Sequence, residues 1–359
     1  MRTQTFFFYC YLPEQPSLFS QNLTFLNQTK NKIIGFIILF IILFGIYLFP
    51  FLVRSCFAED SSSIKTHAAT EAPVSATQEE WNPPSVGPIT TWTAGLCGKG
   101  KFQIQPFFFY NMSRGSFDSK GDFKTLSSGD KQYQYQEQIL LKYGFTDNIE
   151  LAAQTVYQQN YIKQGDLKAH DAGLGDSLLL LRYCTCNEKE KSWLPDIDGM
   201  FQLKIPTGKY QHLDPNKLGA DLNGATPDPG AWAPGIGIDM TKKLKPFILH
   251  FDYIYSFPQQ VRVDGVNTDY ANFINSDFAV EYFLAKGFSL MLEANTFWQG
   301  DKWQNGARQP STGVRYVTVS PGIGWANDKI QTLIAYQRVV LGKNIAANDS
   351  LVLTCVYTF

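Results

Sequence analysis

Glutamine recurs at every second position in one short stretch of the chain. Gln132, Gln134, Gln136 and Gln138 alternate with mostly large apolar or aromatic residues, and a period of two places them on one face of a β-strand. Neutral amides solvate water and uncharged polar solutes without holding them tightly, which suits a permeation path. The same amides could also bond to one another and plug the interior. The pattern alone leaves both interpretations open.

Charged residues fall on the inward face of other segments. We expect them, together with the glutamines, to line a lumen. The expected lining consists of Gln132, Gln134, Gln136, Gln138, Gln154, Arg182, Lys204, Asp239, Asp252, Asp277, Glu281 and Glu293. The basic residues, with Lys142, come earlier in the chain than the acidic ones, so opposed sectors could orient a polar solute. A second interpretation, favoured for Asp176, Asp198, Lys204 and Arg182, is that salt bridges in the lumen hold neighbouring strands together.

Residues that could support catalysis or bind a metal form no recognisable site. His250 and Asp252 lie two positions apart, but no serine is tied to them by a motif, and a membrane phospholipase would need Ser and His together on the outer wall. Cys184 and Cys186 are too close for an easy mutual bridge and lack a second ligand pair for zinc. A disulfide between Cys97 and one of these two residues is one possibility, and free thiols are the other. We expect no enzyme activity, no metal and no cofactor.

The elements that position these side chains are period-two runs beyond Lys101. Twelve runs of about 11 to 15 residues match the length of tilted membrane-spanning strands. They cover 101–112, 131–145, 148–161, 173–186, 196–206, 230–242, 246–257, 272–285, 287–299, 314–326, 329–340 and 349–359. The last run alternates apolar and smaller residues and ends on Phe359, which resembles the C-terminal signal that the barrel-assembly machinery reads in bacterial outer-membrane barrels.

The connections between these runs alternate in length. Long polar loops are expected at 113–130, 162–172, 207–229, 258–271, 300–313 and 341–348, and mostly short turns between them. Bacterial barrels pair short periplasmic turns with long external loops. The fold class predicted is therefore all-β: a single closed antiparallel transmembrane barrel of about twelve strands over 101–359, preceded by a signal helix and a flexible tether.

Composition agrees with such a barrel. The chain of 359 residues contains 28 Phe, 18 Tyr and 28 Gly but only 18% charged residues, and its mean hydropathy of -0.17 is too low for a bundle of membrane helices. An apolar stretch, 33–53, precedes small residues before Glu59. We expect a signal peptide over 1–58, cleaved after Ala58, with an uncleaved inner-membrane anchor as the alternative. Residues 59–100 would then form a flexible periplasmic segment.

Removal of that leader takes away four of 31 basic residues and one of 32 acidic residues. The exported chain would thus carry a net charge of -4, which does not favour a nucleic-acid partner.

Two short motifs carry a family resemblance. They are Gly173-Leu174-Gly175-Asp176 and, further on, Pro206-Thr207-Gly208-Lys209. With the strand ends around them they resemble the outer-membrane family named after the meta-pathway of phenol degradation. The resemblance implies an outer-membrane barrel of a Gram-negative bacterium, and some members are proposed as uptake channels. It does not transfer a substrate.

The leading functional hypothesis is passive uptake of small, mostly uncharged or aromatic solutes through a porin-like channel. The loop that begins at 207 is long enough to fold inward, so Tyr210, His212 and Asp214 are candidates for a constriction; an external loop without solute contact is the equal alternative. We expect outer-membrane lipid to surround the barrel. The alternatives from other classes are a closed structural or adhesive barrel and, less favoured, a membrane phospholipase.

Overall fold

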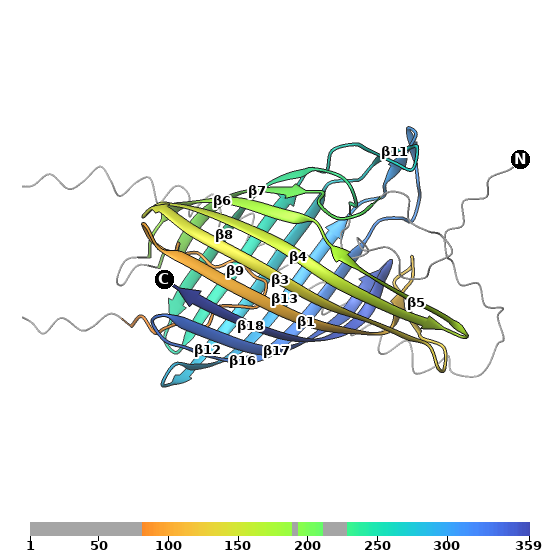
Figure 1. Ribbon diagram of the computed structural model, residues 1–359. Helices are drawn as coiled ribbons and strands as arrows, with labels where there is room; N and C mark the ends of the chain where they lie inside the picture. Colours follow the sequence, from red (N-terminus) through yellow and green to blue (C-terminus); the bar gives the residue numbers. More distant parts are fainter. Residues whose placement is uncertain (1–80, 189–192, 211–227) are drawn as a thin grey trace, which may run out of the picture. The chain divides into compact units, whose positions relative to one another are not determined.

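The computed structural model describes residues 81–188, 193–210 and 228–359. The signal peptide, its cleavage after Ala58 and most of the expected tether lie outside these residues. Twelve long strands form the wall (Figure 1): β1 (Phe102–Phe117), β3 (Lys131–Thr146), β4 (Ile149–Gln164), β6 (Ser177–Cys186), β7 (Asp196–Ile205), β8 (Ala233–Leu244), β9 (Phe247–Ser256), β12 (Phe273–Ala285), β13 (Phe288–Gln299), β16 (Arg315–Ala326), β17 (Ile330–Lys343) and β18 (Ile345–Thr358). In the described parts of the chain, no helix is long and apolar enough to cross a membrane.

The wall closes between its first and last strands. β18 pairs antiparallel with β1 along most of its length, with Phe108 opposite Leu353. At the very end of the chain, the Phe359 N–H donates to the Phe102 carbonyl at 2.9 Å. Closure pairs the backbone groups that an open edge would leave facing lipid. The predicted closed twelve-stranded barrel is confirmed.

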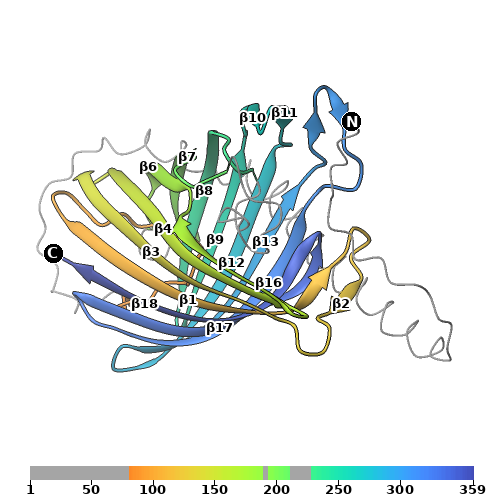
Figure 2. The same ribbon diagram turned by 45° about the vertical axis from the view of Figure 1, so that its right-hand side comes forward.

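The two ends of the barrel differ, as the connection lengths predict (Figure 2). At the end where β1 begins and β18 finishes, adjacent strands are joined by turns such as 147–148 and 286–287. At the other end β4 continues into a hairpin with β5 (Leu167–Leu174). Two further connections there form a separate four-stranded sheet from β10 (Val261–Val263), β11 (Val266–Asp269), β14 (Trp303–Gln304) and β15 (Ala307–Arg308).

Some expected loops are in fact strand. The expected loop 162–172 is mostly the β4–β5 hairpin, and the short β2 (Phe123–Thr125) lies within 113–130 and pairs with β1. The expected loop 341–348 is also wrong, because a single residue, Asn344, separates β17 from β18. Asn344 has a φ of 52°, the left-handed conformation that Asn tolerates in tight turns. A polar sequence at this end of the barrel therefore does not exclude strand pairing, since β4 and β5 pair through it.

The outer face is apolar, whereas the inner face combines polar side chains with a buried apolar cluster that includes Phe107, Leu140 and Leu180. In β3, Tyr135, Ile139, Leu141 and Tyr143 are exposed on the outside, as the period of two predicts. Aromatic rings cluster near the ends, for example Tyr133 stacked on Tyr161 with ring centroids 4.5 Å apart. This arrangement matches an apolar band with aromatic girdles.

Candidate functional site in the barrel lumen

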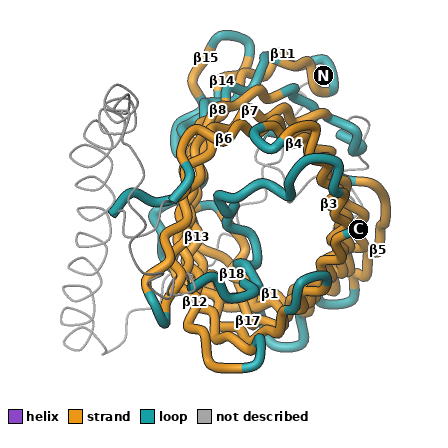
Figure 3. Tube along the Cα trace, turned by 90° about the vertical axis from the view of Figure 1, so that its left-hand side faces the viewer, coloured by secondary structure: helices purple, strands orange, loops and turns teal. Residues whose placement is uncertain are grey.

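Residues 81–100, which we call the lumen segment, lie inside the barrel. Trp81 packs edge-on against Phe283 at the short-turn end, and Gly100 N–H donates to the Gly144 carbonyl at 2.7 Å. Between these points, the segment contacts the inner faces of β12, β13, β9, β7 and β4 in turn. Figure 3 views the barrel from this end, with loop inside the ring of strands. This differs from the expectation of a flexible periplasmic segment over 59–100.

Two buried glutamates hold the first half of the lumen segment. Glu281 accepts from Val86 N–H at 2.9 Å and from the Ser85 hydroxyl at 2.6 Å. Glu293 accepts from the backbone N–H groups of residues 89, 90 and 91 at 2.6, 3.0 and 2.9 Å, and from both threonine hydroxyls of that stretch. Hydrogen bonds to a carboxylate are about twice as strong as neutral ones. These hydrogen bonds are made largely by the backbone of the segment, while its Val86 and Ile89 side chains pack into the apolar cluster of the lumen.

Three more carboxylates hold the second half. Asp252 accepts from Trp92 N–H at 2.6 Å, Asp198 from Gly95 N–H at 3.0 Å, and Glu150 from Cys97 N–H at 2.8 Å. Burial, reinforced by the neighbouring Glu150, raises the pKa of the Cys97 thiol to about 12, so this thiol is a poor nucleophile. The four described cysteines are all free, so the open link from Cys97 to Cys184 or Cys186 is absent.

Arg182 lies at the centre of the acidic wall. Its guanidinium is 1% exposed and contacts Glu150 at 2.7 Å, Asp198 at 3.1 Å and Asp239 at 2.9 Å. It also donates to the Thr93 carbonyl of the lumen segment at 2.5 Å. One cation thus serves three carboxylates and one backbone oxygen. The salt bridge expected between Arg182 and Asp198 is therefore present. The expected separation of basic and acidic sectors does not hold for Arg182, because it lies among the acidic residues.

Lys204 forms a second cluster at the long-loop end. Its ammonium lies 2.9 Å from Asp176 Oδ2 and 3.0 Å from Asp228 Oδ1. Burial raises the pKa of Asp228 to about 7, although Lys204 opposes the shift. Among the constriction candidates, His212 and Asp214 lie outside the described residues. Tyr210 packs its ring on Gly230, where a Cβ would lie 2.3 Å from the ring.

The amide side chains gather on the opposite wall. Gln134 accepts from Asn111 at 2.8 Å and donates to Asn160 at 2.8 Å, and Gln154 donates to Gln138. Gln136 lies opposite Gln158 in the β3–β4 register, whereas Gln132 is exposed near the outer end of β3. The structure thus brings Gln134, Gln138 and Gln154 to one wall, where several amides bond to one another, but it does not bring Gln132 into this group.

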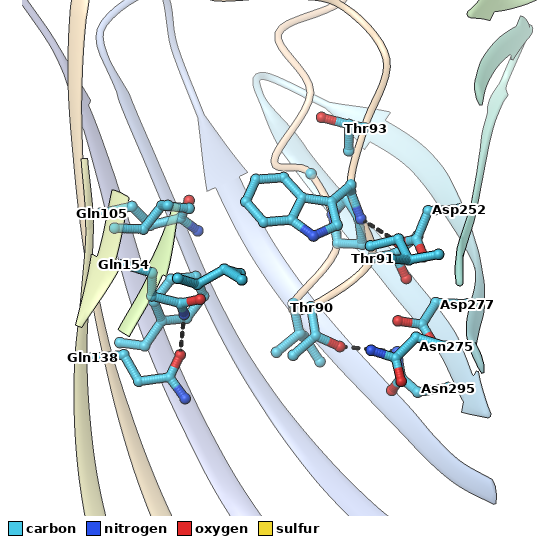
Figure 4. A pocket seen from close by; sticks show the side chains of 18 of the residues that line it. Thr90, Thr91, Thr93, Gln105, Gln138, Gln154, Asp252, Asn275, Asp277 and Asn295 are labelled. Carbon is cyan, nitrogen blue, oxygen red and sulfur yellow. Dashed lines mark hydrogen bonds between the residues drawn. The ribbon is translucent and has the colours of Figure 1, made fainter. Parts of the chain in front are cut away.

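A cavity of about 490 Å³ remains inside the barrel, bordered by the lumen segment, by the amide wall and by residues of β9, β12 and β13. Figure 4 shows its two sides: Gln105, Gln138 and Gln154 on one, and Asp252, Asp277, Asn275 and Asn295 on the other. The lumen segment passes between them with Thr90, Thr91 and Trp92 at the cavity. In the part of the chain that the structure describes, no group of three or more His, Cys, Asp or Glu side chains is placed to hold a metal ion.

His250 faces the interior rather than the outer wall. It is 2% exposed, its Nδ1 lies 3.0 Å from the Thr241 hydroxyl, and its Nε2 lies 3.8 Å from Glu281. A lipid substrate outside the barrel cannot reach it. The described residues therefore offer no support for the phospholipase alternative at this histidine.

Two glycines in the strands allow the lumen segment to pass close to the barrel wall. A Cβ on Gly144 would lie 2.0 Å from the Gly98 carbonyl oxygen, and one on Gly324 would lie 2.4 Å from Val86. Glycine inside a strand often marks the close approach of another backbone. This was the signal in the sequence for a segment inside the barrel, together with more inward carboxylates than nearby cations could neutralise.

Comparison with known proteins places the chain in a family. The family model described as "Putative MetA-pathway of phenol degradation" matches residues 128–354. The chain belongs to this family. Its resemblance, predicted from two short motifs, is confirmed, and family and barrel fold together support an outer-membrane location.

Solved structures show the same fold. An outer membrane channel from Pseudomonas putida F1 is 17% identical, with a TM-score of 0.60 over 76% of this chain and 100% of that chain. The β domain of the Bordetella autotransporter BrkA (13% identity, TM-score 0.42, 73% of this chain and 100% of that chain) and the KdgM porin (8%, 0.38, 71% and 99%) are more distant. These two likenesses are too weak to add to the fold assignment. No curated protein matches the chain.

Proposed function

We propose that this protein is a passive outer-membrane channel whose path is narrowed by its own lumen segment. The observation that carries the proposal is the polar cavity of about 490 Å³ beside that segment, inside a closed barrel. Side chains fill the interior of a barrel of about eight strands, and the interior widens as the number of strands rises. Here, the lumen segment and the amide side chains of the wall leave space that a small solute can occupy.

The lining of the cavity favours small, mostly uncharged solutes. Gln105, Gln138 and Gln154 offer both donors and acceptors without charge. Trp92, Phe107 and Tyr316 add ring faces at the same cavity, so small aromatic solutes remain within the proposal. Amides and rings that bind weakly suit a path along which a solute must also leave.

We propose further that entry from outside is filtered by the connection between β7 and β8. Its first described residues end at Tyr210, which is half-buried against Gly230. The roles of His212 and Asp214 as constriction residues belong to this proposal.

Export and assembly complete the proposal. We infer cleavage after Ala58 and recognition of the last strand through Phe359, which is 69% exposed at the closing seam of the barrel. The adhesive and phospholipase alternatives receive no comparable support from the family or the fold.

Liposome swelling tests the proposal directly. The chain is refolded, and a heat-modifiable gel shift establishes that the barrel has formed. Proteoliposomes are then diluted into iso-osmotic solutions of small sugars and phenols. Swelling with small solutes but not with oligosaccharides is the expected result. Vesicles that stay impermeable despite a folded barrel would contradict a channel and favour a structural barrel.

A further inference from the structure

Four aspartates lie side by side across the inner wall. The register places Asp198 opposite Asp239, Asp239 opposite Asp252, and Asp252 opposite Asp277, on β7, β8, β9 and β12. Directly opposed residues on one face have Cβ atoms roughly 4.5–5.5 Å apart, and like charges so placed destabilise a sheet. This row must therefore be neutralised.

The first two aspartates are neutralised by a residue of the barrel. Arg182 lies 3.1 Å from Asp198 Oδ2 and 2.9 Å from Asp239 Oδ2. No ion pair among the described residues brings Arg or Lys to Asp252 or Asp277. Lys142 lines the same cavity, but its ammonium lies over the Trp92 ring, 5.6 Å from the ring centroid. The second half of the row lacks a cation of its own.

Asp252 also has an oxygen without a partner. It is 1% exposed, and while its Oδ2 accepts the Trp92 N–H, its Oδ1 makes no hydrogen bond. Asp277 accepts the Thr296 N–H at 3.2 Å. Both side chains line the cavity, beside Asn275 and Asn295 (Figure 4). A buried carboxylate oxygen that lacks a partner is costly, so this part of the cavity is suited to a positive charge.

We propose that Asp252 and Asp277 form a binding site for a small monovalent cation, and that this site makes the channel prefer cations to anions. The proposal rests on the channel function proposed above. Two carboxylates supply hard oxygen ligands, which suit alkali cations better than transition metals. Acidic side chains at a narrow point confer cation selectivity on pores, and uncharged solutes would pass the same cavity along its amide wall.

The test compares D252N/D277N with a matched control, D166N/D269N, which makes the same charge change at exposed positions of the outer hairpins. Reversal potentials are measured in planar bilayers under a KCl gradient. The wild type and the control should prefer potassium to chloride several-fold, and the preference should fall toward unity in D252N/D277N. An unchanged preference in a conducting D252N/D277N channel would overturn the proposal.

A second measurement does not require permeation. Sodium-23 NMR line widths are recorded for the same three proteins folded in detergent, with NaCl as the probe. Broadening by the wild type and the control, lost in D252N/D277N, is expected. Equal broadening by all three proteins overturns the cation site, whether or not the barrel conducts. Absence of conductance with broadening intact contradicts only the channel function.

Discussion

The two walls of the lumen make different kinds of contact. The acidic wall, from β4 through β13, carries Glu150, Asp198, Asp252, Glu281 and Glu293, whose carboxylates hold the backbone of the lumen segment. The amide wall on β1, β3 and β4 bonds largely to itself and borders open space. Charged side chains therefore fix the segment while neutral amides border the path, because carboxylates bind N–H groups strongly and amides bind solutes weakly.

The largest effect is expected at the centre of the acidic wall. R182M leaves three carboxylates without their cation, and removal of one partner from a buried ion pair costs roughly 3–5 kcal/mol. We expect the heat-modifiable band to be lost at lower urea concentration. R315M, at an exposed position of β16, is the control and should behave like the wild type. Equal urea midpoints for the two variants would show that the acidic wall is not held by Arg182.

A second change loosens the segment without removing the central cation. E281Q/E293Q replaces charge-assisted bonds, each worth roughly 1.5–3 kcal/mol, by neutral ones. Amide hydrogen exchange of the peptide 85–91, followed by mass spectrometry, should accelerate at least about tenfold. E137Q makes the same chemical change on the outer face and should leave exchange unaltered. If exchange in E281Q/E293Q stays at the wild-type rate, these glutamates do not anchor the segment.

The Lys204 cluster predicts a dependence on pH. Because burial raises the pKa of Asp228 from an ordinary 3.8 to about 7, the folded chain binds more protons than the unfolded chain between these values. Stability contributed by this residue is therefore greatest below pH 4 and falls as the pH rises toward 7. Thermal unfolding of D228N should lose this fall, and D166N, in an exposed turn, should retain it. Parallel curves for D228N and the wild type would refute the assignment.

The smallest effect is expected on the amide wall. Q138A/Q154A removes a neutral hydrogen bond worth about 1 kcal/mol and enlarges the cavity. We expect faster swelling with small sugars, near wild-type urea stability and unchanged hydrogen exchange of 85–91. Faster hydrogen exchange of 85–91 in this variant would show that the amide wall also holds the lumen segment, which would contradict the difference between the two walls.

The sequence predicted the wall better than its contents. The period of two in β3 and β9 placed Gln134 and Asp252 inside, because a half-buried strand leaves a local pattern. The composition of residues 81–100 does not itself indicate that they enter the barrel, since many of their polar contacts are made by backbone N–H groups. The signals lie elsewhere in the chain, in the strand glycines and in the unneutralised inward carboxylates. The partners of Glu281 and Glu293 lie about 200 residues away in the chain. Strand extensions beyond the membrane, such as β5, were missed because polar residues there resemble loops.

If the lumen segment narrows the path, its removal should raise the single-channel conductance. Chains of residues 81–359 and 96–359 are refolded, a heat-modifiable shift verifies that each barrel has closed, and both are recorded in the same bilayer and salt. Our account predicts a several-fold larger conductance for the shorter chain. Equal conductance from two folded barrels would contradict it.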